Sequence, residues 1–525
     1  MMRKTLASLL LCSSLLVPAC GKKASREPVG EELTAAPYIT ADKAANTGGG
    51  AGVAMGSGYA APGYAMKDDK GGSEGYTDHG KNPWVEAAKD HLSTFAADVD
   101  TASYSLARKK LEEGVLPVAA GVRVEEFVNY FKYSFPQPGN DSPFSVIMEA
   151  APSPLAPGRH IVRVGVATKA KTAQERKPAN LVFLVDVSGS MQSGDKIELL
   201  KQSLKTLTAN LTDKDTVSLV TYAGSTRVVL EPTSDKSRIT EALDQLNAGG
   251  STAMASGIDL AYKQAMQGLR PGAISRVIVL SDGDANVGAH THEEILKIIE
   301  GRAKEGVTLT TVGFGQGNYK DNLMEQLADK GNGNSFYIDS IDEATKVFQT
   351  DLTATLEVVA KDAKFQVDFD PAMVSRYRLV GYENRDIADN DFRNDKIDAG
   401  EIGAGHQVTA LYEVELTAQG KQANAPLGGV RIRHKAPNGE KATEAAFPMI
   451  GGPAESFANS SADFRFAFAT AAFADVLRGG PDAERWSLAD IRDMAKAAAG
   501  DAADRRELVS LIEKAIALKG RTAVR

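Results

Sequence analysis

The strongest hydrophobic pattern in the chain is an unbroken apolar run, Leu181–Val185, which leads directly into the polar positions Asp186, Ser188 and Ser190. A continuous run of this length predicts a strand buried on both faces, as in a parallel sheet. Apolar residues then recur at helical spacing between positions 197 and 211. The three polar residues are therefore expected where the strand leaves the sheet, which is the edge at which open α/β sheets bind ligands.

Segments with these two patterns alternate over residues 179–350, where apolar runs are separated by amphipathic stretches. Further strands are predicted at Thr216–Tyr222, Val277–Leu280, Val307–Val312 and Ser335–Ile338, with helices near 239–246, 292–304 and 319–330. Thr226–Leu230 is expected to pair with the strand before it as a hairpin. This alternation predicts an α/β fold with a doubly wound, mostly parallel, Rossmann-like sheet.

The segments on either side of this region show period-two alternation, which is typical of antiparallel sheets. Residues 142–178 contain two such strands, and residues 351–455 contain several more. We predict that they form one β-domain, with residues 179–350 inserted between its two halves. Helical spacing predicts a helical flanking region over residues 83–141 and a helical C-terminal region over residues 456–525.

Two further oxygen-bearing residues stand at the ends of predicted elements. Thr252 follows two glycines and a serine between two helical patterns, and Asp282 follows the strand Val277–Leu280. Their order and strand context resemble the metal-ion-dependent adhesion site of von Willebrand factor type A (VWA) domains, formed here by Asp186, Ser188, Ser190, Thr252 and Asp282. Most of residues 80–520 resemble a family of bacterial lipoproteins in which flanking regions accompany such a domain.

The resemblance implies a role for each of these five residues. Ser188 and Ser190 would bind a divalent cation through their hydroxyls, and Thr252 would bind it directly or through water. Asp186 and Asp282 would hold the coordinating waters. Hydroxyl and carboxylate oxygens suit Mg²⁺ best, with Mn²⁺ or Ca²⁺ as alternatives. One coordination position would stay open for an acidic side chain of a protein ligand.

Each part of the motif also has an interpretation without a metal. The Asp186–Ser190 motif and Thr252 could cap helices, and Asp282 with Gly283 could form a turn. These explanations would have to coincide at three separate places in the right order. We therefore favour the metal site over helix capping and turn formation.

Other polar clusters give weaker signals. His290 and His292 could bind zinc, but no third soft ligand accompanies them, and a solvated loop is the preferred interpretation. An acidic cluster hints at calcium but departs from the EF-hand, because Arg393 and Asn394 occupy positions that require an oxygen ligand and a glycine. We expect a surface loop there, carrying Asp389, Asp391, Asp395 and Asp398.

The N-terminus carries the second strong signal. Two basic residues precede an apolar run that ends in Leu16-Val17-Pro18-Ala19-Cys20, which resembles a bacterial lipoprotein signal. Residues 1–19 would be a signal peptide, and Cys20 would be lipidated; an ordinary secretory signal cut near Ala19 is the alternative. Residues 20–82, rich in Gly, Ala and Ser, are expected to be a flexible tether. The protein is then exported and anchored in the cell envelope through Cys20, and Gly21 weakly favours the outer membrane.

Composition and charge narrow the range of functions. The 525 residues carry a formal net charge of −8 and no long basic run, so nucleic-acid binding is not expected. We prefer the hypothesis of a non-enzymatic envelope protein that binds a protein ligand through the divalent cation. The alternatives are a periplasmic metal-assisted hydrolase and a structural or assembly factor whose metal site stays empty.

Overall fold

The computed structural model describes residues 76–97, 100–139, 142–172, 174–283, 291–315, 319–351, 356–397, 399–422, 425–437 and 439–522. The chain divides into two units, Met1–Asp68 and Asp69–Arg525, and every described residue belongs to the second. Within the described residues, no helix combines the length and the apolar character that crossing a bilayer requires.

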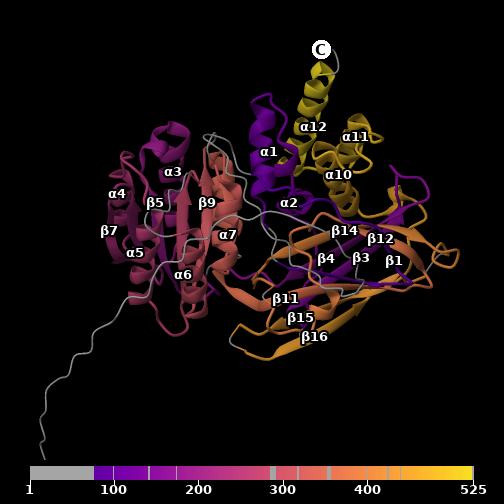
Figure 1. Cartoon of the computed structure of the whole chain (residues 1–525), viewed down its shortest axis with the longest axis horizontal. Helices are drawn as coiled ribbons and strands as arrows, with labels where there is room; N and C mark the ends of the chain where they lie inside the picture. Colours follow the sequence, from indigo (N-terminus) through magenta and orange to yellow (C-terminus); the bar gives the residue numbers. More distant parts are fainter. Residues whose placement is uncertain are drawn as a thin grey trace, which may run out of the picture. The chain divides into compact units, whose positions relative to one another are not determined.

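A six-stranded sheet forms the centre of the region between residues 179 and 350 (Figure 1). Its strand order is β10-β9-β8-β5-β6-β7. Five strands are parallel: β5 (Ala179–Asp186), β6 (Thr216–Tyr222), β8 (Ile274–Ser281), β9 (Val307–Phe314) and β10 (Ser335–Ile338). β7 (Thr226–Thr233) is antiparallel to β6, which makes the predicted hairpin. The predicted α/β class, with a doubly wound and mostly parallel sheet, is confirmed.

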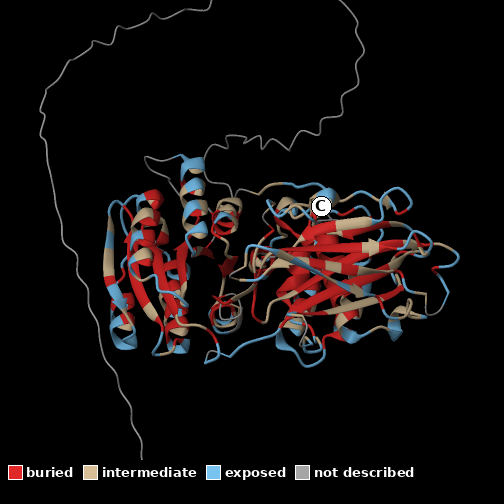
Figure 2. Ribbon diagram, turned by 90° about the horizontal axis from the view of Figure 1, so that it is seen from below, coloured by how far each residue is buried: buried red, intermediate tan, exposed pale blue. Residues whose placement is uncertain are grey.

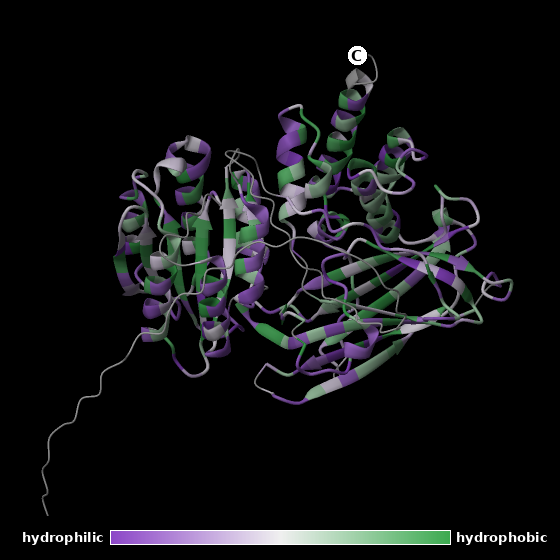
Figure 3. Ribbon diagram, viewed as in Figure 1, coloured by the Kyte–Doolittle hydropathy of each residue, from purple (hydrophilic) through white to green (hydrophobic). Residues whose placement is uncertain are grey.

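Helices cover both faces of this sheet because its central strands are apolar on both sides. Leu181, Phe183 and Val185 of β5 face one core, whereas Val182 and Leu184 face the other. The first core is closed by α3 (Leu199–Asn210), α4 (Lys236–Asp244) and α8 (Ile341–Thr345). The second core is closed by α5 (Met254–Gln267), α6 (His292–Lys304) and α7 (Asp321–Lys330). Figure 3 shows the apolar strands between helices that carry polar residues outward.

The flanking strands form two antiparallel sheets that share one apolar core. The first sheet has the order β1 (Val85–Glu86), β12 (Val374–Val380), β14 (Gln407–Leu416), β4 (His160–Thr168) and β3 (Phe144–Pro152). The second contains β13 (Ile402–Gly403), β11 (Val358–Phe369), β15 (Gly428–Lys435) and β16 (Ala442–Pro448), with β2 (Leu92–Ala96) paired to β11. β4 pairs with β14 over eight residues, so strands from before and after the doubly wound region do form one β-domain, as predicted.

The predicted helical flanking region over residues 83–141 contains two helices but also two short strands that were not predicted. This region supplies β1 and β2 to the two sheets before its helices α1 (Ala102–Glu112) and α2 (Val124–Tyr130) begin. Phe95 of β2 is 1% exposed and lies in the core of the β-domain. Strands this short give little periodic signal, and their partners lie more than 250 positions further along the chain.

The flexible tether was predicted to reach residue 82, but its last residues, 76–82, belong to the folded unit. Residues 76–82 have no helix or strand but contact the folded unit. Asn82 Nδ2 donates hydrogen bonds to the carbonyl oxygens of Gly381 (2.6 Å) and Leu379 (3.2 Å), and a side chain at Gly121 would collide with the ring of Tyr76. Residues 1–75, including the predicted signal peptide and Cys20, lie outside the described residues.

The helices of the N-terminal flanking region and the C-terminal helices share a separate core. It joins α1 and α2 to α10 (Ala462–Leu477), α11 (Leu488–Ala498) and α12 (Ala503–Thr522), and it reaches Ile161 of β4 and Leu411 of β14. Figure 2 shows that buried residues continue through the strands of the β-domain. The helical prediction for the C-terminal region agrees with these elements.

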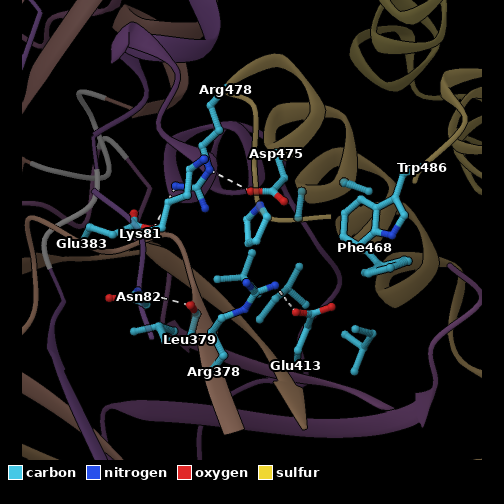
Figure 4. A pocket seen from close by; sticks show the side chains of 16 residues that line it. Lys81, Asn82, Arg378, Leu379, Glu383, Glu413, Phe468, Asp475, Arg478 and Trp486 are labelled. Atoms are coloured by element: carbon cyan, nitrogen blue, oxygen red, sulfur yellow. Dashed lines mark hydrogen bonds and ion pairs between the residues drawn. The ribbon is translucent and has the colours of Figure 1, made fainter. Parts of the chain in front are cut away.

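A small hollow of about 20 Å³ lies where α10 meets β12 and β14 (Figure 4). Most of its charged side chains are paired with one another, and Lys81 Nζ donates to the carbonyl oxygen of Gly479. Arg478 contacts Asp475 (2.8 Å) and Glu383 (2.9 Å), and Arg378 pairs with Glu413. The Arg478–Glu383 pair joins the end of α10 to the β-domain. The three pairs account for most of the charges in an otherwise apolar lining of Phe468, Trp486 and aliphatic residues.

Candidate metal site

Asp186 ends β5 with its carboxylate completely buried. Its Oδ1 accepts a hydrogen bond from the backbone N–H of Ser188 (2.8 Å), and its Oδ2 accepts one from Ser281 Oγ (2.9 Å). Burial raises the pKa of Asp186, the bonds from Ser188 and Ser281 counteract this, and the negative charge of Asp282 raises the pKa further. The carboxylate is therefore fixed in orientation and close enough to Asp282 to feel its charge.

The two serine hydroxyls of the motif lie next to each other. Ser188 Oγ and Ser190 Oγ are 2.9 Å apart, and Ser188 is 1% exposed. Ser188 stands at the N-terminus of a short 3₁₀ turn, η2 (Gly189–Gln192), but makes no side-chain capping bond there. The alternative interpretation of this motif as a helix cap is therefore not supported for Ser188.

Backbone hydrogen bonds place the Thr252 loop beside this motif. The Gly249 N–H donates to the carbonyl oxygen of Val187 (2.7 Å), and the Gly189 N–H donates to the carbonyl oxygen of Gly250 (2.9 Å). Gly250 has a φ of +97°, which an L side chain rarely adopts. Thr252 lies two residues before α5, whose N-cap is Ala253 without a side-chain cap. Thr252 is thus not the helix cap that the alternative interpretation required.

The third loop, which carries Asp282, lies beside the loop of Ser190. It is fully buried directly after β8, and its Oδ2 accepts a hydrogen bond from Lys196 Nζ (2.9 Å). The same ammonium donates to the carbonyl oxygen of Ser190 (3.1 Å), so one cation bridges the Asp282 and Ser190 loops. Gly283 has a φ of +77° and donates to Ser281 Oγ (3.0 Å). A turn is therefore present at Asp282–Gly283, as the interpretation without a metal required. The Asp282 carboxylate is linked to the motif through Lys196.

The donor set fits a small divalent cation. Two buried carboxylates and two adjacent hydroxyls meet at the carboxyl edge of the sheet, and the ammonium of Lys196 already stands at this edge as a positive charge. Oxygen donors of this kind select Mg²⁺, Mn²⁺ or Ca²⁺. Hydrogen bonds join Asp186 to Ser188 and Ser188 to Ser190, and Lys196 links Ser190 to Asp282. The loop of Thr252 is joined to the motif through Gly249 and Gly250.

Sequence reasoning missed two residues at this edge, Lys196 and Ser281. Lys196 falls inside an amphipathic pattern, where a lysine is expected on the solvated face. Ser281 immediately precedes Asp282 at the end of a predicted strand, and this position alone could have placed it at the site. Neither belongs to the motif of the VWA adhesion site quoted above.

The weaker candidates do not gather into sites within the described residues. There, no group of three or more His, Cys, Asp or Glu side chains is placed to hold a metal. His292 Nε2 contacts Gln326 Oε1 (2.8 Å), Asp395 pairs with Arg433 (2.8 Å), and Asp389 accepts a bond from Thr94 (2.6 Å). His290 and Asp398 lie outside the described residues.

Comparison with known proteins relates each part of the chain to a family. Residues 180–350 match the von Willebrand factor type A domain, residues 70–163 match the family described as von Willebrand factor, and residues 354–518 match the family described as uncharacterized protein YfbK, C-terminal. The uncharacterized protein YfbK of Escherichia coli (strain K12) is 38% identical over 475 residues, which cover 85% of this chain and 81% of that protein.

Two further similarities are more distant. The uncharacterized protein sll0103 of Synechocystis sp. (strain ATCC 27184 / PCC 6803 / Kazusa) is 25% identical over 283 residues, covering 53% of this chain and 66% of that protein. The solved structure of a von Willebrand factor type A protein from Catenulispora acidiphila aligns with 70% of this chain and 88% of that chain, at 18% identity and a TM-score of 0.40.

These matches indicate the function only in general terms. A VWA domain suggests a role in protein interaction or adhesion, and both protein relatives named above are described as uncharacterized. The family itself is established by the 38% identity over most of both chains. The chain belongs to the YfbK family of bacterial proteins that contain a VWA domain.

Proposed function

We propose that this protein is a non-enzymatic lipoprotein of the cell envelope that binds a protein ligand through a divalent cation. The observation that carries the proposal is the meeting of three loops at one edge of the doubly wound sheet. There Asp186 accepts a hydrogen bond from Ser188 N–H, the hydroxyls of Ser188 and Ser190 are adjacent, and Lys196 links Asp282 to the Ser190 loop. The coarse role of VWA domains in protein interaction is in keeping with such a site.

Each residue of the site would have its own role in binding the cation. Ser188 and Ser190 would hold the cation through their hydroxyls, with Thr252 as the third hydroxyl. Asp186 and Asp282 would supply negative charge, and the bonds from Ser188 N–H and Ser281 Oγ keep the Asp186 carboxylate oriented. When bound, Mg²⁺, or in its place Mn²⁺ or Ca²⁺, supplies an electrophilic centre for an acidic side chain of the ligand.

The anchoring part of the proposal rests on the sequence resemblance alone. Cys20 would carry the lipid and hold the protein at the membrane, facing the periplasm or the cell surface, with the outer membrane weakly favoured. Metabolic labelling with an alkyne fatty acid should mark the wild-type chain and leave Cys20→Ser unmarked. Equal labelling of both forms would contradict the lipid anchor.

The ligand-binding part is tested by co-purification. The full chain, isolated from membranes in Mg²⁺, should retain a protein ligand that is released by EDTA and absent from Asp186→Ala. Asp213→Ala removes an exposed carboxylate of the same domain and should behave as wild type. Retention that survives both EDTA and Asp186→Ala would overturn the proposal. Divalent-dependent turnover of an ester or phosphoester, lost in Ser190→Ala, would instead favour the hydrolase.

A further inference from the structure

Lys196 brings a positive charge into the candidate metal site. It lies in the π-helical turn η3 (Gly194–Glu198) that precedes α3, and it is only 7% exposed. Its Nζ contacts Asp282 Oδ2 at 2.9 Å and the carbonyl oxygen of Ser190 at 3.1 Å. A carboxylate buried as completely as Asp282 is costly without a cation beside it, and Lys196 is a cation in that position.

The Lys196 side chain runs across a glycine in the loop that follows β9. Gly315 follows β9 with a φ of +72°, and any Cβ at this position would collide with the methylene groups of Lys196. The aliphatic stem therefore crosses the backbone at Gly315 before the ammonium reaches Asp282. The close approach shows that the ammonium is held in place by packing as well as by charge.

We propose that Lys196 determines the specificity of this site by making metal binding depend on an acidic ligand. The inference rests on the function proposed above. Among the described residues of the site, Asp186 and Asp282 supply two negative charges and Lys196 one positive charge, so a divalent cation leaves these groups with one excess positive charge. Like charges a few ångström apart in a partly buried site repel strongly, which weakens binding of the metal alone. An incoming carboxylate neutralises the excess, so the ligand and the metal stabilise each other.

The experiment compares Lys196→Met with wild type in the full chain. Methionine keeps a long apolar stem over Gly315 and removes the ammonium. Lys205→Met is the matched control, because Lys205 lies on α3 and its ion pair with Asp244 is exposed. The probe is Mn²⁺ alone, measured by electron paramagnetic resonance and calorimetry without any protein ligand, and Asp186→Ala defines the background.

We expect Lys196→Met to bind Mn²⁺ at least about tenfold more tightly than wild type, since one repelling charge is gone, and Lys205→Met to match wild type. In EDTA, Lys196→Met should melt at a lower temperature than Lys205→Met, because Asp282 loses its counter-charge. Binding of Mn²⁺ by wild type and Lys196→Met with equal affinity, or more weakly by the variant, would overturn the role of Lys196 and leave the metal site standing. Absence of binding above the Asp186→Ala background in both would overturn the metal site itself.

A second pair of variants keeps the test informative if Lys196→Met folds poorly. Lys196→Met combined with Asp282→Asn removes both charges of the pair, and its melting temperature in EDTA should exceed that of Lys196→Met alone. Lys196→Arg keeps the charge and should keep the weak affinity of wild type for Mn²⁺. No recovery in the double variant would show that the ion pair is not what Lys196 contributes, and would overturn the inference.

Discussion

Arg123 Nη1 lies 2.6 Å from Oδ2 of Asp321, the first residue of α7 in the VWA domain. Arg123 belongs to the flanking region and is the N-cap residue of α2. The pair is one of several with the same polarity. Arg385 of the β-domain contacts Glu325 of α7 (3.1 Å), and Arg108 of α1 contacts Asp339 after β10 (2.5 Å). Basic side chains of the flanks therefore meet acidic side chains of the VWA domain across a buried boundary.

The first prediction concerns the cost of breaking this boundary. Arg123→Met should lower the free energy of unfolding by about 3–5 kcal/mol, because Asp321, 1% exposed, is left as an uncompensated buried charge. Denaturant titration followed by circular dichroism measures the loss. The double variant with Asp321→Asn should regain part of it, since the orphaned charge is then removed.

The matched control is a surface pair on α6. Lys304 and Glu300 are 2.7 Å apart, but their side chains are 73% and 44% exposed. Water competes for such a pair, so Lys304→Met should change stability far less than Arg123→Met. Equal losses in the two variants would contradict a special role for the buried boundary.

A second prediction concerns the contact of α5 with the central sheet. A Cβ placed at Gly257 would lie 2.9 Å from Tyr222 Cβ and 3.1 Å from Leu184 Cδ1. Gly257→Ala should therefore destabilise the protein by about 1–3 kcal/mol through overpacking, even though alanine favours helices. Gly301→Ala in α6 meets no atom within 4 Å and should stabilise by up to about 1 kcal/mol. Unfolding curves that shift in the same direction for both variants would contradict this packing argument.

The sequence predicted the doubly wound sheet because its signals are local. The apolar run of β5 and the helical spacing after it reflect two periodicities that act within about fifteen residues. β2 escaped prediction because five residues give little periodicity and its partner, β11, lies far along the chain. The local hydrophobic pattern therefore predicts long helices and strands well. It predicts poorly a short strand whose pairing partner lies far away in the sequence.

The same distinction explains what was missed at the candidate site. The three loops that carry Asp186, Thr252 and Asp282 each end or precede a recognisable element, so their proximity follows from the topology. Lys196 gave no such signal, because its burial depends on the backbone of Gly315, more than a hundred residues later. A lysine in an amphipathic segment is predicted to be solvated until the fold brings that glycine against it.

A third prediction concerns Ser281, whose hydroxyl holds the Asp186 carboxylate. Ser281→Ala removes the bond to Asp186 Oδ2 and leaves a buried carboxylate oxygen with one partner fewer. We expect a loss of about 1–3 kcal/mol in the free energy of unfolding. Ser256→Ala is the control, because its hydroxyl bonds to the carbonyl oxygen of Ala253 at an exposed position of α5. An unchanged stability of Ser281→Ala would show that the bond does not hold Asp186.

A fourth prediction concerns added metal. A ligand that binds only the folded state raises its stability by RT ln(1 + [L]/Kd), which is about 2.7 kcal/mol at a hundredfold excess over Kd. Mg²⁺ should therefore raise the melting temperature of the wild-type chain, and Asp186→Ala should abolish the shift. Asp213→Ala should retain it. A melting temperature that does not respond to Mg²⁺ in any form would favour the structural role in which the site stays empty.

The last prediction follows from His406, which lies just before β14. Burial lowers the pKa of His406 to about 4, and the positive charge of Lys132 adds to this effect. The imidazole is neutral in the folded chain down to this pH, whereas in the unfolded chain it takes up a proton near its ordinary pKa of about 6.5. The unfolded state therefore binds more protons between pH 6.5 and 4, and stability falls as the pH is lowered through this window. The loss is at most about 3 kcal/mol and is complete below pH 4.

His406→Gln removes this titration, so its free energy of unfolding relative to wild type should become more favourable at pH 4.5 than at pH 7.5. Denaturant titrations of both forms across this range measure the difference, and parallel pH profiles would show that His406 is not the group responsible.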